Sequence, residues 1–189
     1  MKRIVIIPGN GGSHVATDNW YPWIQAELQK KGYTVVATDM PDPVAAHMDI
    51  WLPYMESTLK MGEETIAIGH SSGAVAILRY LETHRLAGAV LIGVMHTDLG
   101  FDDEKEAGWY KDPWQWAKIK ENAGWIEQFY STDDPFIPVA EPEFIHTRTN
   151  SVAHIFHDRG HFMIDDKHPN ETVFPELIEV IRSHDKGNL

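Results

Sequence analysis

TIAIGHSSGAV, residues 65–75, is the segment that decides the fold. Residues 65–68 contain a β-branched threonine and a short apolar run, as in a buried strand, and a helical pattern follows over residues 72–84. Gly69 and Gly73 frame the turn between the two elements. A strand that leads through a tight turn into a helix is typical of α/β folds, in which helices cover a parallel sheet.

The same alternation of short apolar runs and helical patterns continues along the chain. Further strands are predicted at residues 4–7, 33–37, 87–94, 125–130 and 152–156. Helices are predicted at about 18–32 with Asp18 or Asn19 as the cap, at 47–59 with an interruption at Pro53, and at about 171–184. Six buried strands separated by helices imply a parallel sheet with helices on both faces. We expect one domain over residues 1–189, with a polar excursion at about 95–122.

Composition excludes several classes of function. The chain has 28 Asp and Glu against 16 Lys and Arg, a formal charge of −12, which disfavours nucleic acid and membrane surfaces as partners. It has no cysteine, so disulfides, thiolate catalysis and Cys-based metal sites are excluded. No apolar stretch reaches transmembrane length, and the run at residues 4–7 is too short for a secretory signal. A cytoplasmic protein is expected.

The turn at residues 69–73 matches the pattern G-x-S-x-G. Between a strand and a helix, this pattern forms a nucleophile elbow, a strained turn that exposes the serine hydroxyl. Ser71 fits as the nucleophile, because a nucleophile at Ser72 would be flanked by the bulky His70. Ser72 would then supply a backbone N–H to an oxyanion hole. The alternative is a serine that only caps the helix.

A serine nucleophile needs a base and an acid, which in this fold class follow it in the order Asp, His. His161 lies on a Gly-bearing loop after the last strand, whereas the rivals His154 and His157 lie within or at the end of that strand. After the fifth strand, Asp133 and Asp134 both qualify as the acid. Asp134 is mildly preferred, because the following proline favours an extended backbone there.

The glycine-rich segment PGNGG, residues 8–12, follows the first strand. In this fold class that loop supplies the second oxyanion donor, so the N–H groups of Asn10 and Gly11 are candidates. A phosphate-binding loop is the alternative reading. It is disfavoured because the segment lacks both G-x-G-x-x-G and a following Lys-Ser/Thr pair.

At these residues the chain resembles the retinoblastoma-binding protein 9 family of serine hydrolases, a compact branch of the α/β-hydrolases. The matching segments span nearly the whole chain: residues 8–12, 40–43, 50–53, 69–74, 82–85, 113–116, 131–136 and 160–162. The resemblance implies a catalytic triad of Ser71, Asp134 and His161. It further implies a three-layer α/β/α sandwich with a six-stranded parallel sheet in the order 2-1-3-4-5-6. Small ester or amide substrates and no cofactor are implied as well.

One departure concerns a protein partner. The family's namesake interaction depends on an L-x-C-x-E segment, and the corresponding residues 59–63 read LKMGE, without the cysteine. Binding to retinoblastoma protein is therefore not expected of this chain.

The excursion at 95–122 lies where such hydrolases place a lid. Its aromatic residues either line a substrate pocket, with Trp109, Trp114 and Trp116 as the candidates, or pin the loop to the core. Two rival functions remain. The first is a metal site built from the cluster His154, His157, His161, Asp165, Asp166 and His168, although no metal is predicted. The second is a hydrolase-fold protein that mainly binds other proteins.

Overall fold

The computed structural model describes residues 3–186 and contains one six-stranded sheet. The strands are β1 (Arg3–Ile7), β2 (Thr34–Ala37), β3 (Thr65–His70), β4 (Gly88–Ile92), β5 (Ile126–Ser131) and β6 (Val152–Phe156). Every neighbouring pair is parallel, and the order is β2-β1-β3-β4-β5-β6. The predicted fold class and strand order are confirmed.

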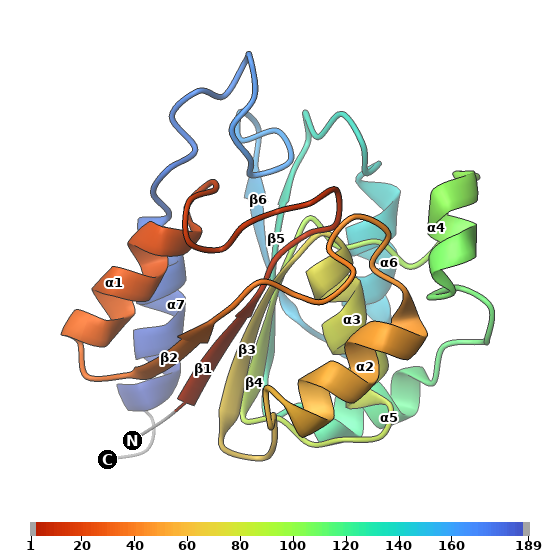
Figure 1. Cartoon of the computed structure of the whole chain (residues 1–189), viewed down its shortest axis with the longest axis horizontal. Helices are drawn as coiled ribbons and strands as arrows, with labels where there is room; N and C mark the ends of the chain where they lie inside the picture. Colours follow the sequence, from red (N-terminus) through yellow and green to blue (C-terminus); the bar gives the residue numbers. More distant parts are fainter. Residues whose placement is uncertain (1–2, 187–189) are drawn as a thin grey trace.

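Helices cover both faces of this sheet. They are α1 (Tyr21–Lys30), α2 (Met48–Ser57), α3 (Ser72–Leu81), α4 (Asp102–Ala107), α5 (Trp116–Asn122), α6 (Ala140–Thr149) and α7 (Pro175–Lys186). Figure 1 shows α1 and α7 on one side of the sheet and the other helices on the opposite side. The result is a three-layer sandwich.

Strand β1 shows why both faces must be covered. Successive side chains of a strand point to opposite faces. Ile4 and Ile6 therefore belong to the apolar cluster under α1 and α7, while Val5 and Ile7 belong to the cluster under α2 and α3. All four side chains are buried. A continuous apolar run in the sequence is thus the mark of a strand with helices on both sides.

Some predicted boundaries were wrong. Pro53 lies inside α2 and does not interrupt it, and α7 begins at Pro175. Neither Asp18 nor Asn19 caps α1: Asp18 accepts the His14 N–H, and Asn19 accepts the Ile164 N–H. These short polar side chains instead fix the loops around the helix start.

The excursion contains two short helices, α4 and α5, and α6 follows β5 without having been predicted. The buried side of α6 consists of Glu141, Pro142, Ile145 and Thr149. A helix that buries a glutamate, a proline and a threonine lacks the apolar period from which helices are recognised. The helix ends at Asn150 in the left-handed conformation, a position that asparagine tolerates well.

Because all strands run in the same direction, the segments after β1, β3, β5 and β6 emerge at the same edge of the sheet (Figure 1). Ligand sites of open α/β sheets lie at this carboxyl edge. Over residues 3–186, no helix has the length and apolar character needed to cross a bilayer.

Candidate active site

Ser71 occupies a strained position between β3 and α3. Its backbone has φ 54° and ψ −121°, a region that residues with a side chain rarely adopt. Two main-chain hydrogen bonds hold Ser71 in this conformation. The Ser71 N–H donates to the Ile92 carbonyl at 2.8 Å, and the Ser71 carbonyl accepts the Ala74 N–H at 2.9 Å. Backbone strain that the surrounding structure holds in place is characteristic of functional sites.

The two glycines of the pattern are required by close backbone contacts. A Cβ atom at Gly69 would lie 2.5 Å from the Gly73 carbonyl oxygen, and one at Gly73 would lie 2.3 Å from the Ile7 oxygen. Helix α3 therefore packs against the end of β1 through bare backbone. This contact holds the serine between them at the carboxyl edge of the sheet.

The two adjacent serines differ in their access to the cavity. Ser71 lines a cavity of about 720 Å³ at the carboxyl edge of the sheet, whereas Ser72 is 1% exposed. The Ser72 hydroxyl is buried, and no described residue forms a hydrogen bond with it. Of the two hydroxyls, the one at Ser71 is placed for contact with a ligand.

His161 and Asp134 form a buried pair. His161 Nδ1 lies 2.7 Å from Asp134 Oδ2, and the side chains are 6% and 2% exposed. The second carboxylate oxygen of Asp134 accepts the N–H groups of Phe136 and Ile137 at 2.9 and 3.0 Å. Because the carboxylate can only accept from Nδ1–H, the lone pair of a neutral ring lies on Nε2.

Asp133 has a different role. Its Oδ1 accepts the Ser131 hydroxyl at 2.5 Å and the Gly160 N–H at 3.1 Å, and its Oδ2 lies 3.2 Å from His168 Nε2. Burial alone would raise the pKa of Asp133, but these hydrogen bonds outweigh it and lower the pKa. Asp133 thus fixes the loop that carries His161, and Asp134 is the carboxylate in contact with the imidazole.

Ser71 and His161 line the same cavity. In the described part of the chain, no hydrogen bond joins their side chains. The room for the imidazole comes from Gly93 at the end of β4, where a Cβ atom would lie 2.8 Å from His161 Cε1. Gly93 has φ 56°, which favours glycine, and the absence of a side chain leaves space for the His161 ring.

The predicted oxyanion donors differ in availability. Gly11 donates its N–H to the Val44 carbonyl at 3.1 Å, so of the two candidates Asn10 and Gly11 the structure disfavours Gly11. Asn10 lines the cavity, and its main-chain N–H bonds to no residue within 3–186. Ser72 is the first residue of α3, where a helix has no internal acceptor for its N–H. Asn10 and Ser72 are the donors that remain.

The cavity wall contains both apolar and acidic side chains. The apolar side chains are those of Met95, Leu99, Phe101, Phe136, Ile137, Met163 and Ile164. Asp18, Asp103 and Glu104 supply carboxylates, and no lysine or arginine among the described residues lines the cavity. Burial raises the pKa of Glu104, which accepts the Asn10 side-chain N–H at 3.3 Å.

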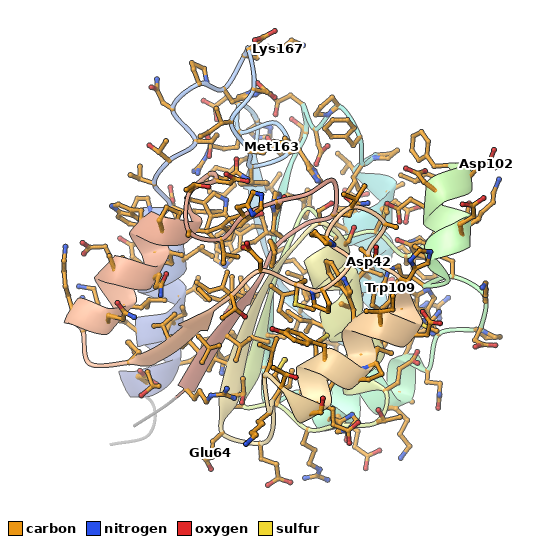
Figure 2. The ribbon with its side chains drawn as sticks, in the orientation of Figure 1. Asp42, Glu64, Asp102, Trp109, Met163 and Lys167 are labelled. Carbon is orange, nitrogen blue, oxygen red and sulfur yellow. The ribbon has the colours of Figure 1, made fainter. Side chains whose placement is uncertain are left out.

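The three tryptophans predicted to line the substrate pocket lie elsewhere, which corrects that prediction. Trp109 is fully buried, packs edge-on against Trp51 of α2, and donates to the Ala46 carbonyl at 2.8 Å. Trp114 stacks on Trp116. In Figure 2, Trp109 lies well away from Met163 and the loop beyond β6.

The excursion therefore divides into two parts. Its tryptophans hold it to the rest of the protein, and the Arg79 guanidinium of α3 lies 3.7 Å above the Trp114 ring. Its first residues, among them Leu99, Phe101 and Glu104, form the cavity wall. A sequence pattern rich in tryptophan does not distinguish these two uses.

The histidine and aspartate cluster near the end of the chain is dispersed over separate partners. His154 pairs with Glu127, His157 with Thr132, and His168 with Asp165 and Asp133. Among residues 3–186, no group of three or more such side chains is arranged to hold a metal ion.

Two residues that the sequence analysis did not select border the site. His70 is buried directly before Ser71, and Tyr21, the first residue of α1, lies 2.6 Å from its Nδ1. The sequence offered only a weak signal for them, the bulky side chain of His70 within a tight glycine turn.

Comparison with known proteins identifies the family of this chain. The sequence profile of the family described as serine hydrolase matches residues 4–181. The chain is 46% identical over 182 residues to serine hydrolase RBBP9 of Rattus norvegicus, covering 96% of this chain and 94% of that protein.

Two solved structures share the fold at low sequence identity. The crystal structure of the ydeN gene product of Bacillus subtilis has a TM-score of 0.86 at 24% identity and covers 98% of this chain and 100% of that one. Est1E of Butyrivibrio proteoclasticus with bound ferulic acid has a TM-score of 0.76 at 11% identity, covering 98% and 90%. The resemblance inferred from the motifs is confirmed, and this chain belongs to the serine hydrolase family.

Proposed function

We propose that this protein hydrolyses small ester or amide substrates through an acyl-enzyme formed on Ser71. The observation that carries the proposal is the buried Asp134–His161 pair at 2.7 Å, which shares a cavity with the serine of the strained elbow. Family membership supports hydrolysis, and the site supports the covalent route.

The proposed reaction has two halves. His161 Nε2 accepts the Ser71 hydroxyl proton while Oγ attacks the substrate carbonyl carbon, and Asp134 stabilises the imidazolium. The N–H groups of Asn10 and Ser72 stabilise the oxyanion. His161 then protonates the leaving alcohol or amine, and water repeats the sequence to release the acid. The serine–imidazole hydrogen bond forms when substrate fills the cavity, since such bonds often tighten only in the complex.

The cavity wall bears on the choice of substrate. Leu99, Phe101 and Phe136 offer apolar contact to an acyl or leaving group. Asp18, Asp103 and Glu104 disfavour a negatively charged substrate. Neutral or cationic substrates with an apolar group are therefore the proposed class, and no cofactor takes part in the scheme.

The segment at residues 59–63 bears on a protein-binding role. Leu59 and Met61 are buried in the core, and the Met61 carbonyl accepts the Tyr80 hydroxyl at 2.8 Å. The missing cysteine and the burial of Leu59 and Met61 support the proposal that retinoblastoma protein is not a partner. Nucleic acid and membranes are not proposed as partners either, on account of the net charge of −12.

A fluorophosphonate probe and small p-nitrophenyl esters test the proposal. We expect the wild-type protein to be labelled and to turn over ester, Ser71→Ala to lose both, and Ser72→Ala to keep both. Ser72→Ala is a matched control because it leaves the backbone N–H in place. Labelling or ester turnover that persists in Ser71→Ala would refute Ser71 as the nucleophile. A wild-type protein that neither reacts with the probe nor turns over ester would favour a mainly protein-binding role instead.

A further inference from the structure

Both ring nitrogens of His70 are engaged in the interior. His70 is the last residue of β3, lies directly before Ser71 and is 3% exposed. Nδ1 lies 2.6 Å from the Tyr21 hydroxyl, and Nε2 lies 2.7 Å from the main-chain carbonyl oxygen of His161. The residue before the candidate nucleophile is thus bonded to the backbone of the candidate base.

The partners fix the proton positions on this ring. A carbonyl oxygen only accepts, so Nε2 carries the hydrogen, and Nδ1 accepts from Tyr21. Burial, and next the proximity of His161, lower the pKa of His70 to about 3. Burial raises the pKa of Tyr21 to about 12. Near neutral pH the pair is therefore a neutral imidazole and a protonated phenol, with one tautomer selected.

Hydrogen bonds from Tyr21 and its neighbour Trp20 reach the loop after β1 and the loop after β6. The Tyr21 hydroxyl accepts the Gly9 N–H at 3.5 Å, next to the candidate oxyanion donor Asn10. The neighbouring Trp20 donates its Nε1–H to the Phe162 carbonyl at 2.9 Å. Consecutive carbonyls of the loop after β6 are thus held from inside the protein, one by His70 and one by the start of α1.

We propose that His70 is a positioning residue for His161, an inference that rests on the proposed function. Its Nε2–H fixes the main chain of His161, while Asp134 fixes the ring at Nδ1. Because His70 precedes Ser71 directly, the nucleophile and the base share one rigid frame. The His161 carbonyl selects the tautomer of His70 in which Nε2 is the donor, and the Tyr21 hydroxyl supports it by donating to Nδ1.

Two substitutions at His70 separate this role from simple filling of space. His70→Phe keeps the ring volume but removes the donor, whereas His70→Gln keeps an N–H donor near the position of Nε2. We expect kcat of His70→Phe to fall by about 10- to 100-fold with KM within about twofold, because misplacing a reacting group by about 1 Å costs that much. His70→Gln should recover kcat to within about fivefold of wild type. The rate of fluorophosphonate labelling should follow kcat.

Tyr21→Phe tests the Tyr21 end of the hydrogen-bond chain that runs through His70 to His161. It removes only the hydroxyl, and we expect a fall in kcat of about three- to tenfold, since loss of one directing hydrogen bond is a modest change. The double variant Tyr21→Phe/His70→Phe should be no slower than His70→Phe alone, because both residues act through one chain of hydrogen bonds. Circular dichroism and thermal melting confirm that each variant is folded.

Long-range ¹H–¹⁵N correlation spectra read the tautomer directly. We expect a protonated Nε2 and an unprotonated Nδ1 at His70 between pH 5 and 8. An Nδ1–H tautomer, or a His70→Phe variant with wild-type kcat and labelling rate, would overturn the positioning role. The proposed function fails separately, through activity retained in Ser71→Ala.

Discussion

Asp134 Oδ2 and His161 Nδ1 meet at 2.7 Å although 27 residues separate them in the chain. The contact exists because β5 and β6 are parallel neighbours, so the turns that follow them leave the same edge of the sheet. Asp133, one residue earlier, points its carboxylate to Ser131 and the Gly160 N–H. Two adjacent aspartates thus serve the imidazole and the loop backbone respectively.

Asp134→Asn and Asp133→Asn should differ sharply in activity. An amide at position 134 can donate to Nδ1, which favours the tautomer that cannot accept the Ser71 proton, and kcat should fall by about 10³- to 10⁴-fold. Asp133→Asn keeps an acceptor for the Gly160 N–H, and we expect a loss below about tenfold. Steady-state ester hydrolysis measures both. Equal losses, or the reverse order, would show that the acid is misassigned.

The backbone strain at Ser71 predicts that glycine at position 71 gives a more stable protein than alanine, the reverse of the usual order. Ser71→Ala keeps a side chain at φ 54°, whereas Ser71→Gly removes the steric cost, which is about 1–3 kcal/mol. The greater freedom of glycine in the unfolded chain offsets about 0.5–1 kcal/mol of that gain. We expect Ser71→Gly to be more stable than Ser71→Ala by about 0.5–2 kcal/mol in urea titrations.

The same pair of substitutions at Ser72 is the control for the order of stability expected at Ser71. Ser72 lies at helical φ as the first residue of α3, so Ser72→Gly should be less stable than Ser72→Ala. If glycine is also the less stable choice at position 71, the strain is not stored there.

The two parts of the excursion predict different effects of substitution. Trp114→Phe removes the donor to the His96 carbonyl and part of the surface under Arg79, so it should lower the melting temperature and leave KM nearly unchanged. Phe101→Ala lies at the cavity, where the side chain is 52% exposed, so it should raise KM for apolar esters with little effect on stability. Thermal melts and ester kinetics on both variants test this division. A raised KM in Trp114→Phe at unchanged stability would return that tryptophan to the substrate pocket.

The features that could be predicted from the sequence leave a mark in the residue types of one short segment. Gly69 and Gly73 mark the elbow because any Cβ atom there would meet backbone, and the run at residues 4–7 marks a strand because both of its faces are buried. The features that could not be predicted depend on contacts far along the chain. The N–H of Gly11 is taken by Val44, and His70 is bonded to the carbonyl of His161, 91 residues away.

Helix α6 illustrates the same limit. Glu141 is buried in it because the carboxylate accepts the N–H groups of His96 and Thr97 and the Thr97 hydroxyl, all from the segment after β4. A buried glutamate contradicts any apolar pattern, and only the distant partners explain it. The Glu141 carboxylate thus makes three hydrogen bonds to the segment that leads into the cavity wall.

The Glu141 carboxylate should make stability depend on pH. Burial alone would raise its pKa, but the hydrogen bonds from His96 and Thr97 outweigh it and lower the pKa to about 2, against 4.5 for an unperturbed glutamate. Because the folded pKa is the lower one, the stabilisation is complete above about pH 5.5 and is lost as pH falls from 4.5 toward 2. The difference between these two pKa values corresponds to about 3 kcal/mol.

Glu141→Gln measures this contribution. It keeps one acceptor oxygen but removes the charge, so we expect a loss of about 2 kcal/mol in the free energy of unfolding at pH 7 and less than about 1 kcal/mol at pH 3. Glu143→Gln on the same helix is the control, because that residue is not buried and should change stability little at either pH. Urea titrations of the wild type and both variants at the two pH values test the expectation. A Glu141→Gln deficit that is as large at pH 3 as at pH 7 would mean that shape, and not charge, holds the segment after β4 to α6.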